Sequence, residues 1–476
     1  YVQSAQMQGH HNLVWLDYED KEQMFDGHSY NKGGRILHML RNHLGDDAFF
    51  TGLEKYLNEN KFQPAEFHQL RLAFEEVSGQ DLNWFFNQWY LGSGHPKLQF
   101  TQELDEENNQ VIITVAQNQD LELSPIYRIP FEMAIFDNDG KHVHKVELDE
   151  VVESFIFPYT GEVKGILYDN QHMLLAEVDE DKTLEQYVFQ YYNSDRFTSR
   201  RDGLMKGYKL KEGVGQQLII DAMNDKFWKI RELAIGRAKK LKDSKKEEGK
   251  KILLDLVVND PNSHVRAAAL KALSKMMEDE ELEPVLISSI GADRSYTVVS
   301  DALSTYGKFA PDEAIKLAEG LENEKSSKMM FGISQLYAKF SGEEKYDFFE
   351  ELLHGTLVQG FDKLGLMSSF TYYLTRIDGE YAMKAYDIYD GQSKKGGYYM
   401  KLFIPQNLNY LVKAFNANKG DLEEELALHE ENNDPALADQ TRKKIKLNDS
   451  LITKYSDLIQ RLEEEKGNVD TIEEED

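Results

Sequence analysis

The stretch Asn259-Asp-Pro-Asn-Ser-His-Val-Arg-Ala-Ala-Ala-Leu270 gives the clearest indication of the fold. It places an Asp-Pro pair, typical of a helix start, before apolar residues at helical spacing. Similar residues occur 35 positions earlier, from Asn224-Asp225, and 33 positions later, from Asp293. A single unit of this kind cannot bury its own apolar face, so we expect the copies to stack into a helical solenoid.

These repeats resemble HEAT repeats, although their spacing is shorter than the usual roughly 40–47 residues. In each copy the aspartate precedes the first apolar position by five residues, as a helix cap can. We therefore expect Asp225, Asp260 and Asp293 to cap helices, with Pro261 at the first helical position of its copy. The regularity fades after Lys325, but the pattern predicts helices from about Leu184 to the end.

The last part of the chain is strongly acidic. Residues 421–476 carry 18 acidic and 7 basic side chains. We expect a solvated helix near 443–465, followed by a frayed tail that ends in Glu473-Glu-Glu-Asp476.

Upstream of the repeats, between residues 96 and 180, the apolar period changes from helical spacing to two. Val111, Ile113 and Val115 alternate with other residues, as in a half-buried strand. Turn-forming residues separate about seven such segments, a number that suits a small β-sandwich.

Residues 29–90 return to helical spacing. Ile36, Leu40 and Leu44 recur at every fourth position, and we expect Asp46 and Asp81 to act as N-caps of the following helices. The segment 81–90 concentrates aromatic residues in one short helix, which indicates burial. The fold class is thus mainly α with one β-sandwich.

Composition limits the function. The 476 residues carry a net charge of −29, which disfavours a nucleic-acid or anionic-membrane partner. There is no cysteine, so disulfides and thiolate metal sites are excluded. No apolar run is long enough for a transmembrane segment, and no signal peptide is evident. We expect a soluble protein of the cytoplasm or periplasm, and the sequence leaves both the compartment and the oligomeric state open.

The sequence contains few motifs that indicate catalysis or metal binding. The sequence has no His-Glu-x-x-His, no P-loop and no Gly-x-Ser-x-Gly. His142 and His144 share one face of an expected strand, but solvent-facing histidines explain them better than a metal pair does, because no third ligand lies nearby in the sequence. The adjacent His10 and His11 are read as loop residues. By itself, Tyr30 is explained more readily as a structural tyrosine than as a catalytic one.

The segment around Tyr30 nevertheless resembles the aminopeptidase N family of zinc metallopeptidases, the gluzincins. The resemblance covers residues 10–96, the expected C-terminal helical part of a thermolysin-like catalytic domain. It rests on Tyr30-Asn-Lys-Gly33, Arg35-Ile-Leu-His-Met-Leu40, Leu44-Gly-Asp-Asp-Ala-Phe-Phe50, Tyr56-Leu57, Gly79-x-Asp81-Leu-x-Trp84-Phe-Phe-x-Gln-Trp89 and Gly94-His-Pro96. The sandwich and helical region that follow also match the family's order of domains.

The resemblance implies a function for the whole protein: removal of N-terminal residues from peptides by a zinc enzyme. It implies that Tyr30 donates a hydrogen bond to the oxyanion of the reaction, a task suited to a phenol that keeps its proton at neutral pH. In that family the zinc motif and the Gly-x-Met-Glu-Asn strand precede this tyrosine, but neither occurs among residues 1–29.

We therefore expect a C-terminal fragment with three parts: residues 1–95 from the catalytic domain, 96–180 as the β-sandwich and 181–476 as the HEAT-like solenoid. We expect this chain to bind no catalytic zinc and to hydrolyse nothing alone. The main alternative is a non-catalytic relative that uses its solenoid to hold a protein partner. A complete HEAT protein with unrelated N-terminal helices would leave the resemblance over 10–96 unexplained.

Overall fold

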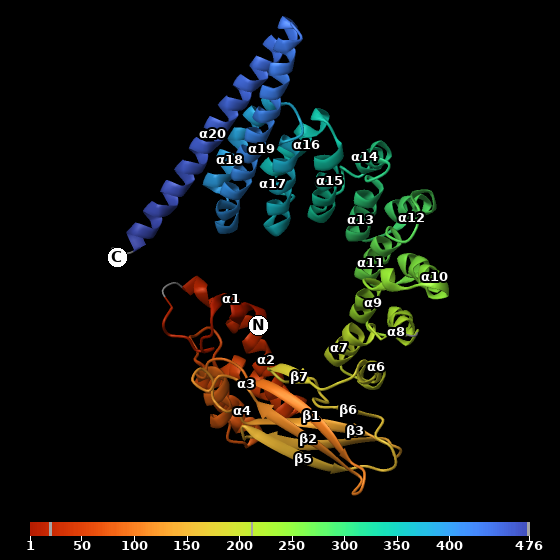
Figure 1. The fold of residues 1–476 in the computed structure, drawn as a ribbon. Coiled ribbons are helices and arrows are strands. Elements are labelled where there is room, and N and C mark those ends of the chain that lie inside the picture. Colours follow the sequence, from red (N-terminus) through yellow and green to blue (C-terminus); the bar gives the residue numbers. More distant parts are fainter. Residues whose placement is uncertain (19–20, 211–212, 474–476) are drawn as a thin grey trace. The chain divides into compact units, whose positions relative to one another are not determined.

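The computed structural model describes residues 1–18, 21–210 and 213–473 (Figure 1). Contacts between residues divide the chain into two compact units, Tyr1–Ile230 and Arg231–Asp476, which are described separately below. None of the described helices combines the length and apolar composition that crossing a bilayer requires.

The first unit begins with short helices. They are α1 (Val2–Gln8), a 3-10 turn η1 (Lys21–Met24), a π-turn η2 (His28–Lys32), α2 (Gly33–Leu44), α3 (Asp46–Glu59), α4 (Phe67–Ser78), α5 (Asn83–Phe86) and a second π-turn η3 (Asn87–Leu91). As the periodicity predicts, Ile36 and Leu40 of α2 are fully buried. The apolar stripe therefore identifies the face of α2 that packs inward.

The two expected N-caps in this region are wrong. Gly45 precedes α3 instead, with a positive φ of 82° that favours glycine and permits the sharp turn from α2. Asp46 lies in the first turn of α3 and forms an ion pair with Arg41, with Nε and Oδ1 2.8 Å apart. The carboxylate of Asp81 accepts from the backbone N–H of Asn83, but Leu82 is the capping residue of α5.

The β-sandwich has the seven strands that the sequence predicts. Its strands are β1 (Lys97–Asp105), β2 (Gln110–Gln117), β3 (Ile129–Phe136), β4 (Lys141–Leu148), β5 (Val152–Pro158), β6 (Gly165–Leu167) and β7 (Glu177–Glu180). One sheet has the order β5-β2-β1-β7 and the other the order β4-β3-β6. Only the β1–β7 pair is parallel; β1–β2, β2–β5, β3–β4 and β3–β6 are antiparallel.

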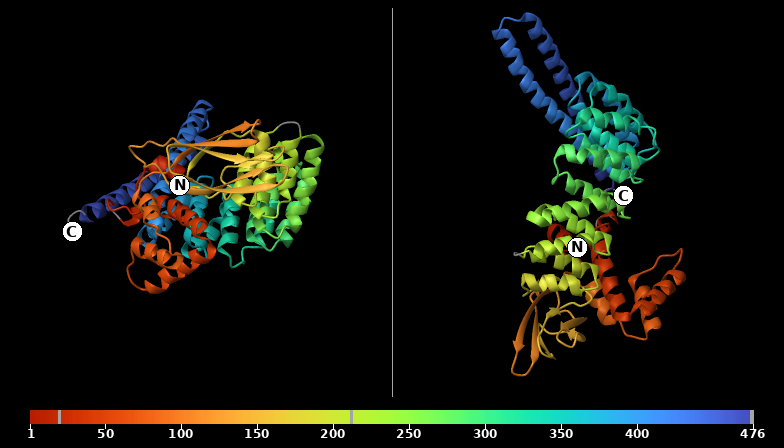
Figure 2. Two further views of the ribbon diagram at one scale, coloured as in Figure 1. Left: turned by 90° about the horizontal axis from the view of Figure 1, so that it is seen from below. Right: turned by 90° about the vertical axis from the view of Figure 1, so that its right-hand side faces the viewer.

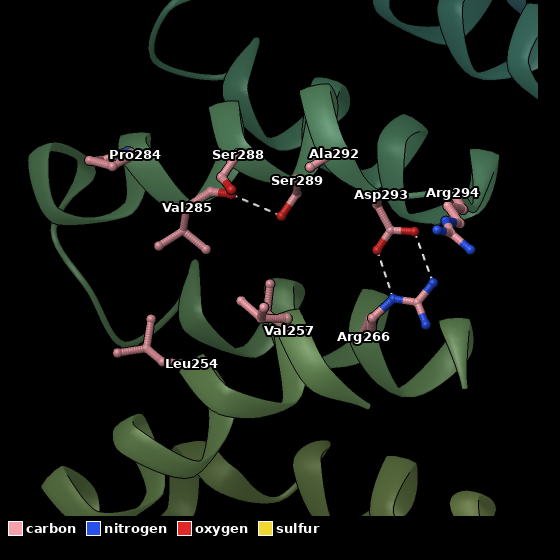
Figure 3. Close-up of a pocket in the computed structure, with 11 residues that line it drawn as sticks. Leu254, Val257, Arg266, Pro284, Val285, Ser288, Ser289, Ala292, Asp293 and Arg294 are labelled. Carbon is pink, nitrogen blue, oxygen red and sulfur yellow. Dashed lines mark hydrogen bonds and ion pairs between the residues drawn. The ribbon is translucent and has the colours of Figure 1, made fainter. Parts of the chain in front are cut away.

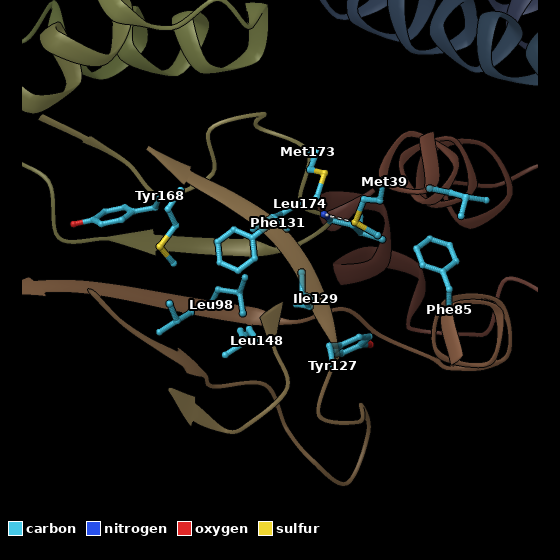
Figure 4. Close-up of a cluster of buried hydrophobic side chains, with 14 of the residues drawn as sticks. Met39, Phe85, Leu98, Tyr127, Ile129, Phe131, Leu148, Tyr168, Met173 and Leu174 are labelled. Atoms are coloured by element: carbon cyan, nitrogen blue, oxygen red, sulfur yellow. Dashed lines mark hydrogen bonds between the residues drawn. The ribbon is translucent and has the colours of Figure 1, made fainter. Parts of the chain in front are cut away.

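The N-terminal helices and the sandwich share one apolar core (Figure 4). Trp89 stacks on Tyr127 with ring centroids 4.8 Å apart, and both side chains are almost fully buried. Met39 of α2 accepts a hydrogen bond at its sulfur from the backbone N–H of Leu175. The guanidinium of Arg35 donates to the carbonyl groups of His172 and Leu174. The sandwich therefore fixes the orientation of α2.

From Leu184 onward, every described element is helical. The helices are α6 (Leu184–Asn193), α7 (Phe197–Gly207), α8 (Val214–Met223), α9 (Trp228–Ile235), a 3-10 turn η4 (Ala238–Lys240), α10 (Asp243–Asn259), α11 (Ser263–Leu273), α12 (Asp279–Ala292), α13 (Tyr296–Tyr306), α14 (Pro311–Glu319), α15 (Ser327–Phe340), η5 (Glu343–Lys345), α16 (Tyr346–His354), α17 (Gly360–Leu374), α18 (Gly379–Lys395), α19 (Tyr398–Glu431) and α20 (Pro435–Glu473). Neighbours α11, α13, α15 and α17 pack in succession, as in a solenoid.

Buried ion pairs join successive repeats. Arg231 binds Asp260 and Arg266 binds Asp293, each with two hydrogen bonds of 2.7–2.8 Å. Figure 3 shows the second pair. The carboxylates are 2% and 9% exposed. An arginine of one repeat thus pairs with the aspartate that begins the next.

This pairing explains why the expected aspartate caps are wrong. Asp260 accepts from the backbone N–H of Asn262, and it is Asn262 that caps α11. Pro261 lies in the turn before that helix rather than at its first position. Asp293 likewise precedes the cap of α13, and Asp225 accepts from the backbone N–H of Phe227. The aspartates close turns and bind arginine.

The acidic C-terminal region packs more closely than expected. Helices α19 and α20 run side by side, as the right-hand view of Figure 2 shows. Leu451, Tyr455 and Leu458 of α20 are almost fully buried, and the Tyr455 hydroxyl donates to the carbonyl of Ala382 in α18. The interpretation of this helix as merely solvated is therefore wrong. Residues 474–476 of the expected tail lie outside the described residues.

The fold class is confirmed: a mainly helical protein with a small two-sheet β region and a HEAT-type helical region. The strands fall between residues 97 and 180, and the helices resume at 184. The division into three parts at residues 95 and 180 stays a prediction.

The first testable prediction concerns the ion pairs of the solenoid. Arg266→Met should lower the free energy of unfolding of the helical unit by about 2–4 kcal/mol, because it leaves the buried carboxylate of Asp293 without its cation. The matched control is Lys271→Met, which removes a 59% exposed lysine paired with Asp301 and should cost less than about 1 kcal/mol. Urea unfolding followed by circular dichroism measures both, and equal shifts would contradict the prediction.

Candidate active-site tyrosine

Tyr30 lies in the π-turn η2, directly before α2. Its side chain is 62% exposed, and no described residue hydrogen-bonds to its hydroxyl group. Phe25, also exposed, is the aromatic neighbour, with ring centroids 6.0 Å apart. The residues two positions before and after it, His28 and Lys32, are fully buried. Tyr30 thus presents an exposed hydroxyl group, a hydrogen-bond donor, on a turn that its buried residues anchor.

Asp26 closes the start of this turn. Its Oδ1 atom accepts from the backbone N–H groups of His28 at 3.0 Å and Ser29 at 2.8 Å. Its own carbonyl oxygen accepts from the backbone N–H of Tyr30 at 3.2 Å. Burial opposes ionisation of Asp26, but the hydrogen bonds from Ser29, His11 and His28 outweigh it and lower the pKa of the carboxyl.

Two histidines complete the surroundings of Asp26. His11 Nε2 and His28 Nδ1 lie 2.8 and 2.7 Å from the same oxygen, Oδ2. The two imidazole rings stack with centroids 3.7 Å apart, and His11 also stacks on Trp15. His11, Asp26 and His28 form the one cluster of three metal-ligand residue types found among the described residues.

The geometry of this cluster fits hydrogen bonding better than zinc. Two ligand atoms on a tetrahedral zinc ion lie about 3.3 Å apart, given bonds of about 2.0–2.1 Å. Here the nitrogen–oxygen distances are 2.7–2.8 Å, and both carboxylate oxygens already accept from two nitrogen atoms each. The His-Glu-x-x-His motif is absent from the 476 residues as well. The geometry of His11, Asp26 and His28 therefore does not fit a catalytic zinc ion.

Lys32 is the other charged residue of the turn. Its side chain is fully buried, and its Nζ donates to the carbonyl of Gly92 at 3.3 Å, with the ring of Tyr1 5.8 Å away. Burial lowers the pKa of Lys32 from 10.5 to about 8. An ammonium group in such a site destabilises the folded state relative to a neutral amine.

Sequence reasoning placed some of these residues correctly and missed others. His11 lies in a loop as expected, but its contact with Asp26 and His28 was missed, because adjacent histidines have no periodicity that indicates a partner. The Asp-x-His spacing of residues 26 and 28 was the available signal. His142 and His144 have separate partners: His142 binds Asp137, and His144 stacks on Phe157.

Comparisons with protein families agree with this arrangement. Residues 3–89 match the model of the peptidase family M1 domain, and residues 217–307 match HEAT repeats. The first match contains the π-turn, α2 and the aromatic helix α5. The second contains the first two of the three repeats in full.

Sequence relatives are aminopeptidases and a related factor. The chain is 25% identical over 346 residues to the tricorn protease-interacting factor F2 of Thermoplasma acidophilum, covering 62% of this chain and 40% of that protein. It is 29% identical over 117 residues to aminopeptidase N of Escherichia coli, covering 24% of this chain and 13% of that protein. The chain therefore spans less than half the length of these relatives.

A solved structure shows the same fold. The aminopeptidase A of Legionella pneumophila, crystallised in complex with aspartic acid, aligns with a TM-score of 0.55 at 13% identity, over 83% of this chain and 56% of that one.

The first helices, which carry Tyr30, are thus similar to part of a peptidase domain, and a β-sandwich and HEAT-type helices follow them. Residues 3–89 of this chain are similar to the M1 peptidase domain, and the sequence relatives of the chain include aminopeptidases.

The second prediction concerns the buried lysine. Between about pH 8 and 10.5 the unfolded chain holds the Lys32 proton and the folded chain has lost it, so stability rises with pH through this window. The difference of 2.5 pKa units corresponds to about 3 kcal/mol. Lys32→Met should remove this rise, whereas Lys61→Met, at an exposed position, should keep it.

Urea unfolding of the three proteins at pH 7.5, 9 and 10.5 measures the effect. The wild-type free energy of unfolding should increase relative to that of Lys32→Met as the pH rises. Parallel pH profiles for the two proteins would show that Lys32 keeps an ordinary pKa in the folded state.

Proposed function

We propose that the whole protein is a zinc-dependent aminopeptidase that removes N-terminal residues from peptides, and that Tyr30 is its oxyanion donor. The observation that carries this proposal is an exposed tyrosine hydroxyl on an anchored turn at the start of α2, within the region that matches the M1 peptidase domain. The names of the relatives support the reaction class, since aminopeptidase N is among them.

The chemistry of this role is simple. Attack of water on a peptide carbonyl produces an oxyanion, and a preorganised O–H donor stabilises the charge as it develops. The Tyr30 hydroxyl can donate such a bond because no described residue already holds it. When bound, zinc supplies polarisation of the carbonyl and activation of water. We propose that the zinc ligands and the general base lie outside these 476 residues.

A second candidate function is a binding scaffold without catalysis. The observation in its favour is a pocket of about 570 Å³ in the helical unit, lined by apolar residues and two serines of α10 and α12, with Arg294 and the Arg266–Asp293 pair at one end (Figure 3). The name of the Thermoplasma relative, an interacting factor, points the same way. An intact zinc motif in the whole protein would favour the enzyme, and substitutions in that motif would favour the scaffold.

The third prediction tests Tyr30. In the full-length protein, Tyr30→Phe should lower kcat for an aminoacyl-anilide by about 10²–10³-fold, because one oxyanion donor is lost, with KM nearly unchanged. Tyr410→Phe alters another exposed tyrosine, in α19, and should leave both constants unchanged. A Tyr30→Phe enzyme with wild-type turnover would remove Tyr30 from the mechanism.

The fourth prediction concerns the 476 residues alone. After equilibration with zinc and dialysis, the purified chain should retain much less than one zinc ion per molecule and should release no product from aminoacyl-anilides. The full-length protein prepared in the same way is the control, and it should do both. One tightly held zinc ion in the shorter chain would show that a catalytic site is formed within it.

A further inference from the structure

Asp26 controls the backbone on which Tyr30 is carried. Through Oδ1 and its carbonyl oxygen, this one residue accepts from the N–H groups of residues 28, 29 and 30. Those three donors form the first edge of the π-turn and would otherwise lack a helical partner. Asp26 therefore determines the direction in which the turn leaves the preceding loop.

The position of Tyr30 depends on this backbone. The side chain is 62% exposed and its aromatic neighbour, Phe25, is 67% exposed, so side-chain packing restrains the phenol little. A small rotation of the turn moves the hydroxyl at the end of the long side chain by a larger amount. A misplacement of about 1 Å can cost on the order of 10²-fold in rate.

Asp26 is itself held by a column of rings. Trp15 stacks on His11, His11 stacks on His28, and Tyr1 packs edge-on against His28. His11 Nδ1 lies 2.7 Å from the carbonyl oxygen of Asn12, and its Nε2 lies 2.8 Å from Asp26 Oδ2. The carboxylate thus links the loop that contains His11 to the turn that contains Tyr30.

We propose that Asp26 is a positioning residue for the peptidase reaction, one that acts by holding the Tyr30 hydroxyl where the oxyanion develops. This inference rests on the proposed function of Tyr30. Asp26 does not touch the substrate; its carboxylate fixes the backbone N–H groups of His28 and Ser29 on one side and two imidazoles on the other. Its removal therefore matters only while a tyrosine hydroxyl is present to be positioned.

A double-mutant cycle in the full-length enzyme tests the proposal. Asp26→Ala should lower kcat by about 10–100-fold with KM within threefold of wild type. In the Tyr30→Phe background the same change should lower kcat by less than twofold, because the group that it positions is already gone. If the kcat of the double variant falls by the product of the two single-variant losses, the proposal is overturned.

Two further variants keep the test decisive. Asp26→Asn preserves the size and an oxygen acceptor for Ser29 while losing the charge that binds the histidines, and it should show a smaller loss and the same non-additivity. It replaces Asp26→Ala in the cycle if that protein does not fold. Asp81→Ala removes a comparable turn-closing carboxylate in the same unit, and it should leave kcat within twofold of wild type.

The results separate this proposal from the one it rests on. If Tyr30→Phe alone has no effect, the proposed role of Tyr30 fails. If Tyr30→Phe is impaired but the Asp26 loss multiplies with it, Tyr30 keeps its role and the positioning role of Asp26 is overturned.

Discussion

The first unit depends on the buried contact between its aromatic helix and its β-sandwich. Trp89 of the π-turn η3, which continues this helix, stacks on Tyr127 in the loop just before β3, within one apolar core. Arg35 and Met39 connect the same sandwich to α2 through hydrogen bonds to backbone groups. Since α2 continues directly from the π-turn that carries Tyr30, the sandwich supports the candidate site as well as the core.

The second unit depends on a different constraint. HEAT-type helices bury apolar faces against their neighbours. Because the hydrophobic effect is not directional, such packing fixes the relative orientation of neighbouring helices only loosely. The bidentate Arg231–Asp260 and Arg266–Asp293 pairs add a directional contact between successive repeats. Because the carboxylates are almost fully buried, each depends on its arginine, and the pairs favour one register of stacking over its alternatives.

Around Tyr30, the buried residues and the exposed residue have different roles. His28 and Lys32 are buried and hold the turn, whereas Tyr30, between them, points away from the core. Buried charge and buried imidazole are costly features of a turn. Such costs are commonly found at functional sites, where a group must be held still without being covered.

The sequence by itself determined the type of each main element, the seven strands and the repeats, because apolar spacing of two or of three to four follows directly from strand and helix geometry. It also singled out Tyr30 through the resemblance of its surroundings. The tertiary structure alone decided that Asp260 and Asp293 form ion pairs, because the arginine that each one binds comes from the preceding repeat. It likewise decided that His11 meets Asp26, since adjacent histidines have no period that indicates a partner. It also decided what covers the buried face of α20, because the partner of Tyr455, the carbonyl of Ala382, lies far away in the sequence.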